Sequence, residues 1–230
     1  MSLSWINGSA STSVKKSELH TSSSASATSS STDGLETILL FGKQCAVIRS
    51  VQHGAKSVVY LCQNTHRVSN LPMHFAVKRM FFPPDQPMEA QRELDLMRPF
   101  SSNCIVQLID GEIARNRGAL CVSLVLEYCP GGSIQNHVAR SSSMPLNDVV
   151  QVACCIASAL SYLHSQQPPI AHRDVKLENI LLANDNMYKL CDFGSATIYA
   201  AECRTVSEAH RVVEEAARTT TLAYRAPELI

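Results

Sequence analysis

The sequence carries no excess charge of either sign, because 20 lysine and arginine residues balance 20 aspartate and glutamate residues. This balance argues against nucleic acid or an anionic membrane surface as the main partner. No uninterrupted apolar run approaches the roughly 20 residues that span a bilayer, so no transmembrane segment is predicted. The nine cysteines form no CxxC pair, which argues against zinc and disulfides and predicts thiols in the reducing cytoplasm.

Large apolar side chains are scarce at the N-terminus. Residues 1–36 consist mainly of Ser, Thr and Ala, and such a segment buries too little apolar surface to offset the entropy of ordering. We therefore predict a disordered tail, either a solvated leader or a regulatory arm that is phosphorylated. Across the whole chain 45% of the residues are hydrophobic, which is enough for a sizeable core after this tail.

Strand-length apolar segments dominate the first half of the chain, and helical patterns dominate the second. A helix is predicted to begin at Pro87, a favourable first-turn residue, and to end near Arg98. Apolar residues at helical spacing predict a core helix at residues 146–164. This order favours an α+β fold with two lobes, residues 37–128 and residues 129–230. The predicted strands are residues 45–50, 58–62, 73–80, 105–110 and 119–127.

The strongest chemical pattern is HRDVKLEN followed by DFG, within residues 172–194. Phosphoryl transfer explains these residue types, with Asp174 accepting the hydroxyl proton and Lys176 offsetting charge on the γ-phosphate. Asn179 and Asp192 supply the oxygen ligands that Mg²⁺ prefers. The alternative is structural, because Asp, Asn and Gly are also ordinary turn residues between strands. The two motifs together resemble the signature of protein kinases, which use ATP and Mg²⁺.

A second motif lies upstream, where residues 75–78 read FAVK. It resembles the kinase strand whose lysine, here Lys78, contacts the α- and β-phosphates and pairs with a helix glutamate. Glu89 and Glu93 lie on one face of the predicted helix, so periodicity leaves both open. The letters REL at residues 92–94 resemble the kinase helix motif, and this resemblance assigns Glu93 as the partner.

The phosphate-covering loop of the kinases has a poor counterpart in residues 52–57, which read QHGAKS in place of GxGxxG. Gly54 still permits close backbone approach to phosphate, although a plain hairpin turn has the same letters. The resemblance implies that Val59, Ala76 and Leu181 also border the nucleotide.

Residues 124–133, which read LVLEYCPGGS, resemble the hinge segment between kinase lobes. The resemblance implies that the backbone of Glu127 and Cys129 binds adenine. A strand ending in a Pro-Gly turn is the alternative reading of these letters.

Residues 219–228 read TTTLAYRAPE and contain the APE triplet that closes a kinase activation segment. By resemblance, Thr221 bonds the catalytic aspartate and lysine, and Lys176 implies specificity for Ser and Thr. DFGSAT at residues 192–197 and TTLAYR at residues 220–225 are similar to the Numb-associated kinase family. That family implies clathrin-adaptor or cytoskeletal protein substrates and a role in endocytosis or actin regulation.

The resemblance implies a bilobal kinase fold, with a five-stranded antiparallel sheet and one helix in the first lobe. The helical lobe is expected to be incomplete, because such kinases continue beyond the APE triplet. Thr205 and Ser207 are candidate phosphorylation sites that would pair with Arg173. The alternative to an active Ser/Thr kinase is a truncated, catalytically silent kinase-like binding module. Cysteine acylation leaves peripheral membrane association open.

Overall fold

The computed structural model describes residues 36–53, 57–65, 71–116, 118–141, 143–183, 186–198 and 205–227. All of them belong to one unit, Gly34–Ile230. The predicted tail up to residue 35, Gly54 of the predicted phosphate loop, and the last residue of the APE triplet lie outside the described residues.

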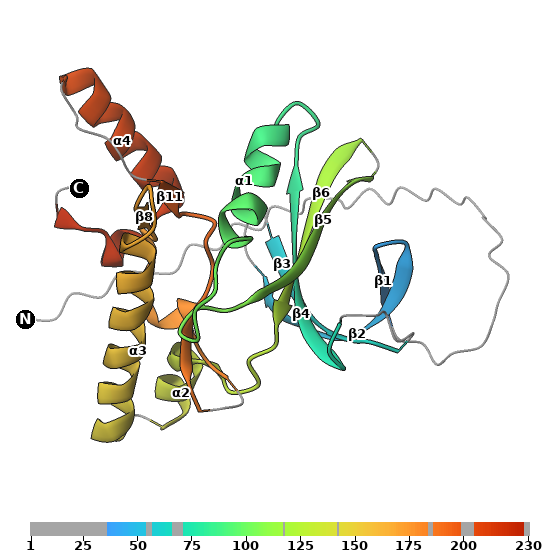
Figure 1. The fold of residues 1–230 in the computed structure, drawn as a ribbon, viewed down its shortest axis with the longest axis horizontal. Coiled ribbons are helices and arrows are strands. Elements are labelled where there is room, and N and C mark those ends of the chain that lie inside the picture. The colour runs from blue at the N-terminus through green and yellow to red at the C-terminus, as the bar shows by residue number, and fades with distance from the viewer. Residues whose placement is uncertain are drawn as a thin grey trace, which may run out of the picture. The chain divides into compact units, whose positions relative to one another are not determined.

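A six-stranded antiparallel sheet, in the order β1-β2-β3-β4-β6-β5, forms the first part of this unit (Figure 1). Helix α1 (Pro87–Met97) is inserted between β4 and β5, as predicted. The sheet has one strand more than the five that were predicted. Strand β6 has the predicted bounds. The strands are β1 (Thr37–Leu40), β2 (Lys43–His53), β3 (Ser57–Gln63), β4 (His74–Phe82), β5 (Leu108–Asn116) and β6 (Ala119–Glu127).

Strand β1, which the sequence analysis missed, is the edge strand of the sheet beside β2. Ile38 and Leu40 alternate with exposed neighbours and are buried against Phe75 and Val77 of β4. A tight turn with positive φ at Phe41 and at the next residue connects β1 to β2, as a two-residue hairpin requires. The short apolar run beside the Ser-rich tail gave too weak a signal for this strand.

The opposite face of the sheet is covered by α1. Ala90, Glu93, Leu94 and Met97 are its buried residues, and this spacing makes one face of a helix. A Cβ atom at Gly111 of β5 would collide with Leu94, so α1 approaches the sheet closely because this position is glycine. The packing holds Glu93 over the strand that carries the predicted lysine.

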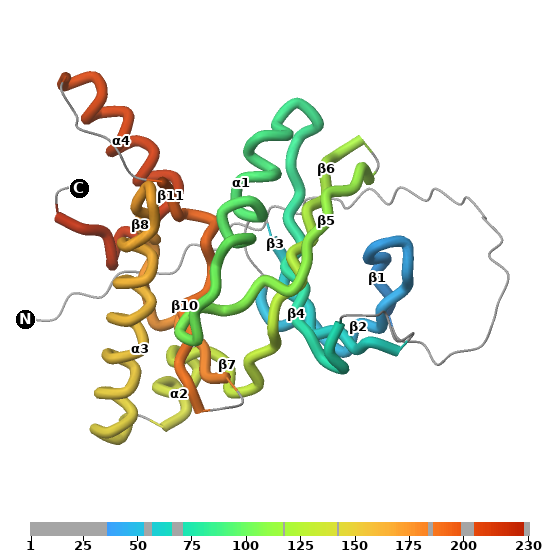
Figure 2. The backbone as a smooth tube through the Cα atoms, in the orientation of Figure 1, coloured from blue at the N-terminus to red at the C-terminus, as the bar shows by residue number. Residues whose placement is uncertain are grey.

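The second part of the unit contains helices and short strands (Figures 1 and 2). One small sheet has the order β10-β9-β7, and a second pairs β11 with β8. Together with the first part, this arrangement is the predicted bilobal, kinase-like α+β fold. The elements are β7 (Gly132–Ser133), α2 (Ile134–Ser141), α3 (Leu146–His164), β8 (Ile170–Ala171), η1 (Leu177–Asn179), β9 (Ile180–Leu182), β10 (Tyr188–Leu190), β11 (Thr197–Ile198), α4 (Val206–Thr219) and η2 (Leu222–Tyr224).

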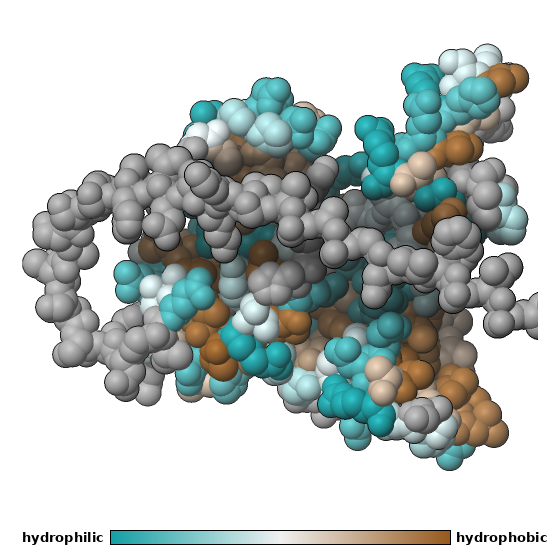
Figure 3. Space-filling model, turned by 180° about the vertical axis from the view of Figure 1, so that it is seen from behind, coloured by the Kyte–Doolittle hydropathy of each residue, from teal (hydrophilic) through white to brown (hydrophobic). Residues whose placement is uncertain are grey.

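Helix α3 has the predicted bounds, but the prediction that it lies in the core holds for only one of its faces. Cys155, Ala159 and Leu163 are buried, whereas Leu146 is 75% exposed and Val150 is 52% exposed. Figure 3 shows apolar surface along this helix. Among the described residues, α3 is the one helix that is long and apolar enough to cross a membrane, by length and composition only.

Candidate functional site

The lysine of the FAVK motif lies at the centre of the large sheet, on the face that α1 covers. Side chains alternate along β4, so Val77 points into the cluster on the β1 side and Lys78 points toward α1. Its Nζ donates to Glu93 Oε1 at 2.7 Å and to Glu93 Oε2 at 2.9 Å. It also donates to Asp192 Oδ1 at 2.8 Å. The structure thus brings together three predicted residues from distant parts of the chain.

Electrostatics favour the charged forms of two members of this cluster, Lys78 and Asp192. Burial alone would lower the pKa of the Lys78 ammonium, but the carboxylates of Glu93 and Asp192 outweigh burial and raise it. Burial would likewise raise the pKa of the Asp192 carboxyl, but the charge and hydrogen bond of Lys78 hold it below its ordinary value. Burial raises the pKa of the Glu93 carboxyl, although the charge of Lys78 opposes this rise. The Lys78 cation beside the Asp192 carboxylate is therefore present at neutral pH.

The HRDVKLEN segment gathers a second group of predicted residues around Asp174. Thr221 donates its hydroxyl to Asp174 Oδ1 at 2.7 Å, and Asn179 Nδ2 donates to Asp174 Oδ2 at 3.0 Å. Lys176 Nζ lies 2.8 Å from Asp174 Oδ2 and 2.7 Å from Thr221 Oγ1. Both carboxylate oxygens are therefore held by polar partners, which fix the orientation of the side chain.

His172 binds the backbone of Asp174. Its ring is buried, packs 4.9 Å from the Phe193 ring centroid, and accepts the Asp174 backbone N–H at Nδ1 (3.3 Å). Nε2 lies 3.1 Å from the Cys191 carbonyl oxygen and is therefore the protonated nitrogen. Burial lowers the pKa of His172, so the ring is neutral and joins the loop of Asp174 to the strand end that precedes Asp192.

Backbone conformation at the site is also unusual. Arg173 has φ +67° and Asp192 has φ +64°, in a region that residues other than glycine rarely adopt. Such outliers concentrate at functional sites, where the surrounding structure enforces them. These two belong to the two motifs that carried the sequence prediction.

A cavity of about 300 Å³ lies beside the first group, and its lining does not include Asp174 or the residues bonded to it. Its lining includes Lys78 and Asp192, and on the hinge segment Glu127 and Cys129. One buried oxygen in this lining, Glu178 Oε2, has no hydrogen-bond partner among the described residues. The predicted Val59, Ala76 and Leu181 all line the same cavity.

The metal ligands Asn179 and Asp192 were predicted from the motifs. The Asn179 side chain donates through Nδ2 to Asp174, which leaves its amide oxygen as an acceptor. In the described part of the chain, no group of three or more His, Cys, Asp or Glu side chains could hold a metal ion. A cation here would therefore rely on one carboxylate, one amide and ligand oxygens, which is the sparse protein coordination typical of Mg²⁺.

The activation segment differs from the sequence expectation. Arg173 was expected to pair with phosphorylated Thr205 or Ser207, but its Nη2 donates to Glu215 Oε1 of α4 at 2.9 Å. The Thr205 hydroxyl instead caps α4 by accepting the Glu208 N–H. In the unphosphorylated chain a glutamate therefore occupies the partner position that the sequence analysis assigned to a phosphate.

Glu215 is placed between two arginines. Arg173 also donates through Nε to the Ser195 carbonyl at 2.7 Å, and Arg92 Nη2 of α1 lies 3.8 Å from Glu215. The hydrogen bond from Arg173 lowers the pKa of the Glu215 carboxyl. Sequence reasoning missed this contact because neighbouring Glu214 offers the same charge, and only the tertiary structure distinguishes the two.

Comparison with known proteins gives a family assignment. The profile described as "Protein kinase domain" matches residues 46–230. A Dictyostelium discoideum protein named as a probable serine/threonine-protein kinase is 34% identical over 197 residues, which are 82% of this chain and 24% of that protein. Actin-regulating kinase 1 of Saccharomyces cerevisiae is 32% identical over 161 residues, covering 67% of this chain and 25% of that kinase.

Actin-regulating kinase PRK1 of Saccharomyces cerevisiae is 28% identical over 205 residues, which are 84% of this chain and 25% of that kinase. The chain thus spans about a quarter of the length of these three relatives.

Proposed function

Since the chain belongs to the protein kinase family and its relatives are serine/threonine kinases, we propose that it transfers the γ-phosphoryl group of ATP to protein hydroxyls. Two observations carry this proposal: Lys78 binds Glu93 and Asp192 beside the cavity that Lys78 and Asp192 line, and Thr221 holds the Asp174 carboxylate. Positioning and charge stabilisation account for most of the catalysis in phosphoryl transfer.

Asp174 acts as the proton acceptor. The substrate hydroxyl oxygen forms a bond to the γ-phosphorus, the bond to the β-phosphate oxygen breaks, and the hydroxyl proton passes to an Asp174 carboxylate oxygen. Lys176, 2.8 Å from that carboxylate, offsets charge on the transferred group. Thr221 holds the carboxylate in place through its hydroxyl and its N–H.

The residues present fit ATP and Mg²⁺. The cavity volume falls at the lower end of the range for small-molecule sites, and the orphaned Glu178 oxygen is an acceptor for a ribose hydroxyl. Lys78 would contact the α- and β-phosphates, and the Asn179 amide oxygen and the Asp192 carboxylate would hold the metal. When bound, Mg²⁺ supplies positive charge that offsets the developing charge on the phosphate oxygens.

The protein substrate would lie at η2. Leu222 and Tyr224 follow Thr221 directly and are 64% and 47% exposed, so they offer apolar surface next to Asp174. We propose a kinase of the Numb-associated type whose substrates are endocytic-adaptor or actin-regulating proteins. Two relatives named actin-regulating kinases support this assignment. A cytoplasmic location is proposed with it, since the eight described cysteines are free thiols.

A transfer assay with γ-labelled ATP and a Thr-containing peptide tests the proposal. Asp174→Asn keeps the side-chain shape and removes the acceptor, so turnover should fall by about 10²- to 10⁴-fold. The matched control is Asp95→Asn, a surface carboxylate of α1, which should leave turnover unchanged. Equal turnover of Asp174→Asn and the unmodified chain would refute the role of Asp174.

The alternative of a kinase-like binding module makes a different prediction for the same chain. A binding module would bind ATP in calorimetry and transfer nothing to any peptide, with Asp174→Asn behaving as the unmodified chain does.

A further inference from the structure

An ion pair that none of the motifs includes joins the hinge segment to β10. Lys189 Nζ donates to both carboxylate oxygens of Glu127, at 2.9 Å each. The Lys189 side chain is 11% exposed and that of Glu127 is 24% exposed. The pair is therefore largely shielded from solvent, where an ionic hydrogen bond is stronger than on the surface.

Glu127 is also fastened to the segment that precedes β5. Its carboxylate accepts the Gln107 N–H at 2.7 Å, and its own N–H donates to the Gln107 carbonyl at 3.0 Å. Next to this pair, the Val106 N–H donates to the Leu190 carbonyl of β10 at 2.9 Å. Three chain segments thus meet at one carboxylate, and in the described part of the chain Lys189 is the cation that pairs with Glu127.

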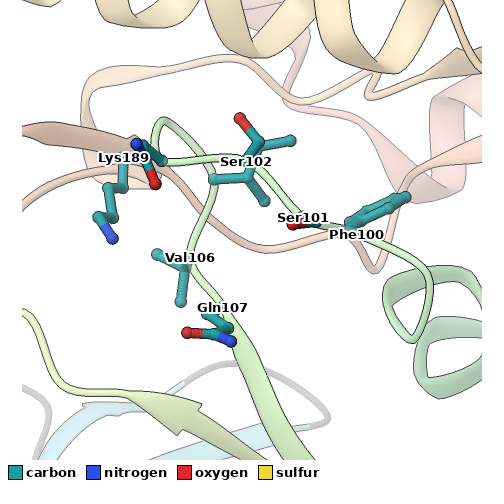
Figure 4. Close-up of a pocket in the computed structure, with 8 residues that line it drawn as sticks. Phe100, Ser101, Ser102, Val106, Gln107 and Lys189 are labelled. Carbon is teal, nitrogen blue, oxygen red and sulfur yellow. The ribbon is translucent and has the colours of Figure 1, made fainter.

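The residues around this ion pair line two cavities. Glu127 and Val106 line the nucleotide cavity, while Lys189, Val106 and Gln107 line a smaller cavity of about 120 Å³ behind it. In Figure 4 the Lys189 side chain extends alongside the segment that carries Val106 and Gln107, whereas Phe100 lies at the far end. Lys189 lines the smaller cavity and not the larger one, so it contacts Glu127 without bordering the larger cavity.

We propose that Lys189 is a positioning residue for the adenine end of the nucleotide. Through the Glu127 carboxylate it fixes the hinge backbone at Glu127 and Cys129 against β10. This inference rests on the proposed function, because it assumes that the nucleotide binds in the larger cavity. Lys189 touches no part of the ligand, so its effect appears in binding and not in the chemical step.

The test uses the full chain and measures the dissociation constants of adenosine and of Mg·ATP by calorimetry, with KM and kcat for ATP from the transfer assay. Lys189→Met keeps the length of the side chain and removes its charge. We expect adenosine and ATP to bind about tenfold more weakly, the effect of a mid-range coupling between contacting residues. kcat should change by less than about twofold, because Asp174 and Lys78 are untouched.

Further variants distinguish a positioning role of Lys189 from an effect on folding. Lys189→Arg retains a cation with parallel donors and should bind adenosine within about twofold of the unmodified chain. Glu127→Gln should weaken adenosine binding about as much as Lys189→Met, and the double variant should be no weaker than either single variant. Arg98→Met, which breaks an exposed ion pair with Asp95, is the matched control and should leave all constants unchanged.

Unchanged adenosine binding in Lys189→Met overturns the inference while leaving the proposed function intact. The inference is also overturned if the loss of adenosine affinity in the double variant is the product of the losses in the two single variants. A loss of ATP affinity with adenosine affinity retained overturns it as well. Failure of the unmodified chain to bind any nucleotide overturns the proposed function and the inference with it.

Discussion

Replacing Glu215 by glutamine should loosen helix α4 from the catalytic loop. The carboxylate accepts one hydrogen bond from Arg173 at 2.9 Å and lies 3.8 Å from Arg92. Glutamine has the same shape, so the substitution removes charge and little packing. The capping box at the start of α4 involves Thr205 and Glu208, so the helix itself should persist and only its attachment should weaken.

The expected magnitude follows from the exposure of the two side chains. Arg173 is 11% exposed and Glu215 is 39% exposed, which places the pair between a surface ion pair, worth about 0.2–1 kcal/mol, and a buried charged hydrogen bond, worth about 1.5–3 kcal/mol. A loss of about 1 kcal/mol corresponds to a roughly fivefold larger population of detached α4.

Amide hydrogen exchange across α4 measures this population directly. The control is Glu214→Gln, because Glu214 is exposed and the two variants have the same net charge. Exchange in α4 should be about fivefold faster in Glu215→Gln and nearly unchanged in Glu214→Gln. Peptide phosphorylation should fall in parallel, because α4 leads directly to Thr221 and the substrate surface.

The pH dependence provides a second check on the same pair. The pKa of Glu215 is lowered in the folded chain, so its contribution is present above the ordinary glutamate value of about 4.3 and is lost as the pH falls through the folded value. The difference between Glu215→Gln and the unmodified chain should therefore persist at pH 7 and vanish in acid. Equal exchange in the two glutamine variants at pH 7 would refute this reasoning.

Three other predictions concern the site. Lys78→Met leaves two carboxylates without their buried cation, so it should lower the free energy of unfolding by about 3–5 kcal/mol in urea titrations. It should also abolish detectable phosphoryl transfer. A stable, active variant would contradict this prediction. Burial lowers the pKa of His172, so the free energy of unfolding should decrease as the pH falls below about 6.5. This pH dependence of stability should weaken in His172→Gln but not in the control His164→Gln, because His164 is exposed. Burial raises the pKa of the Cys191 thiol, so a cysteine-directed alkylating probe followed by mass spectrometry should label the exposed Cys154 first; earlier labelling of Cys191 would exclude this order.

Several features of the protein were predictable because the signal is local. The bounds of α1 and α3 follow from apolar residues at helical spacing and from Pro87 at a helix start. The residue types of the HRDVKLEN and DFG segments indicate phosphoryl transfer, since acceptors, metal ligands and a cation occur in one short stretch. Asp174 and Asp192 could therefore be identified before any geometry was known, whereas Lys78 was assigned by resemblance to the kinase strand motif.

Other features depend on contacts between residues that are distant in the chain. Periodicity placed Glu89 and Glu93 on one face of α1, and a family resemblance chose Glu93; in the structure Glu93 is buried against Lys78. Strand β1 escaped prediction because its apolar run is short, and its stability comes from packing on the sheet. The exposed face of α3 was also missed, because helical spacing identifies an apolar stripe and does not tell what covers it.

Local sequence thus determined the helices α1 and α3, most strands of the large sheet and the side chains that have the chemistry of phosphoryl transfer. Only the tertiary structure decided that Glu215 and not Glu214 binds Arg173, and that Lys189 binds Glu127. The physical reason is that a charged side chain is compatible with many positions on the surface of a helix or strand, so the local sequence does not select its partner. Its partner is set by which distant segment the fold brings within about 3 Å, a distance at which hydrogen bonds form.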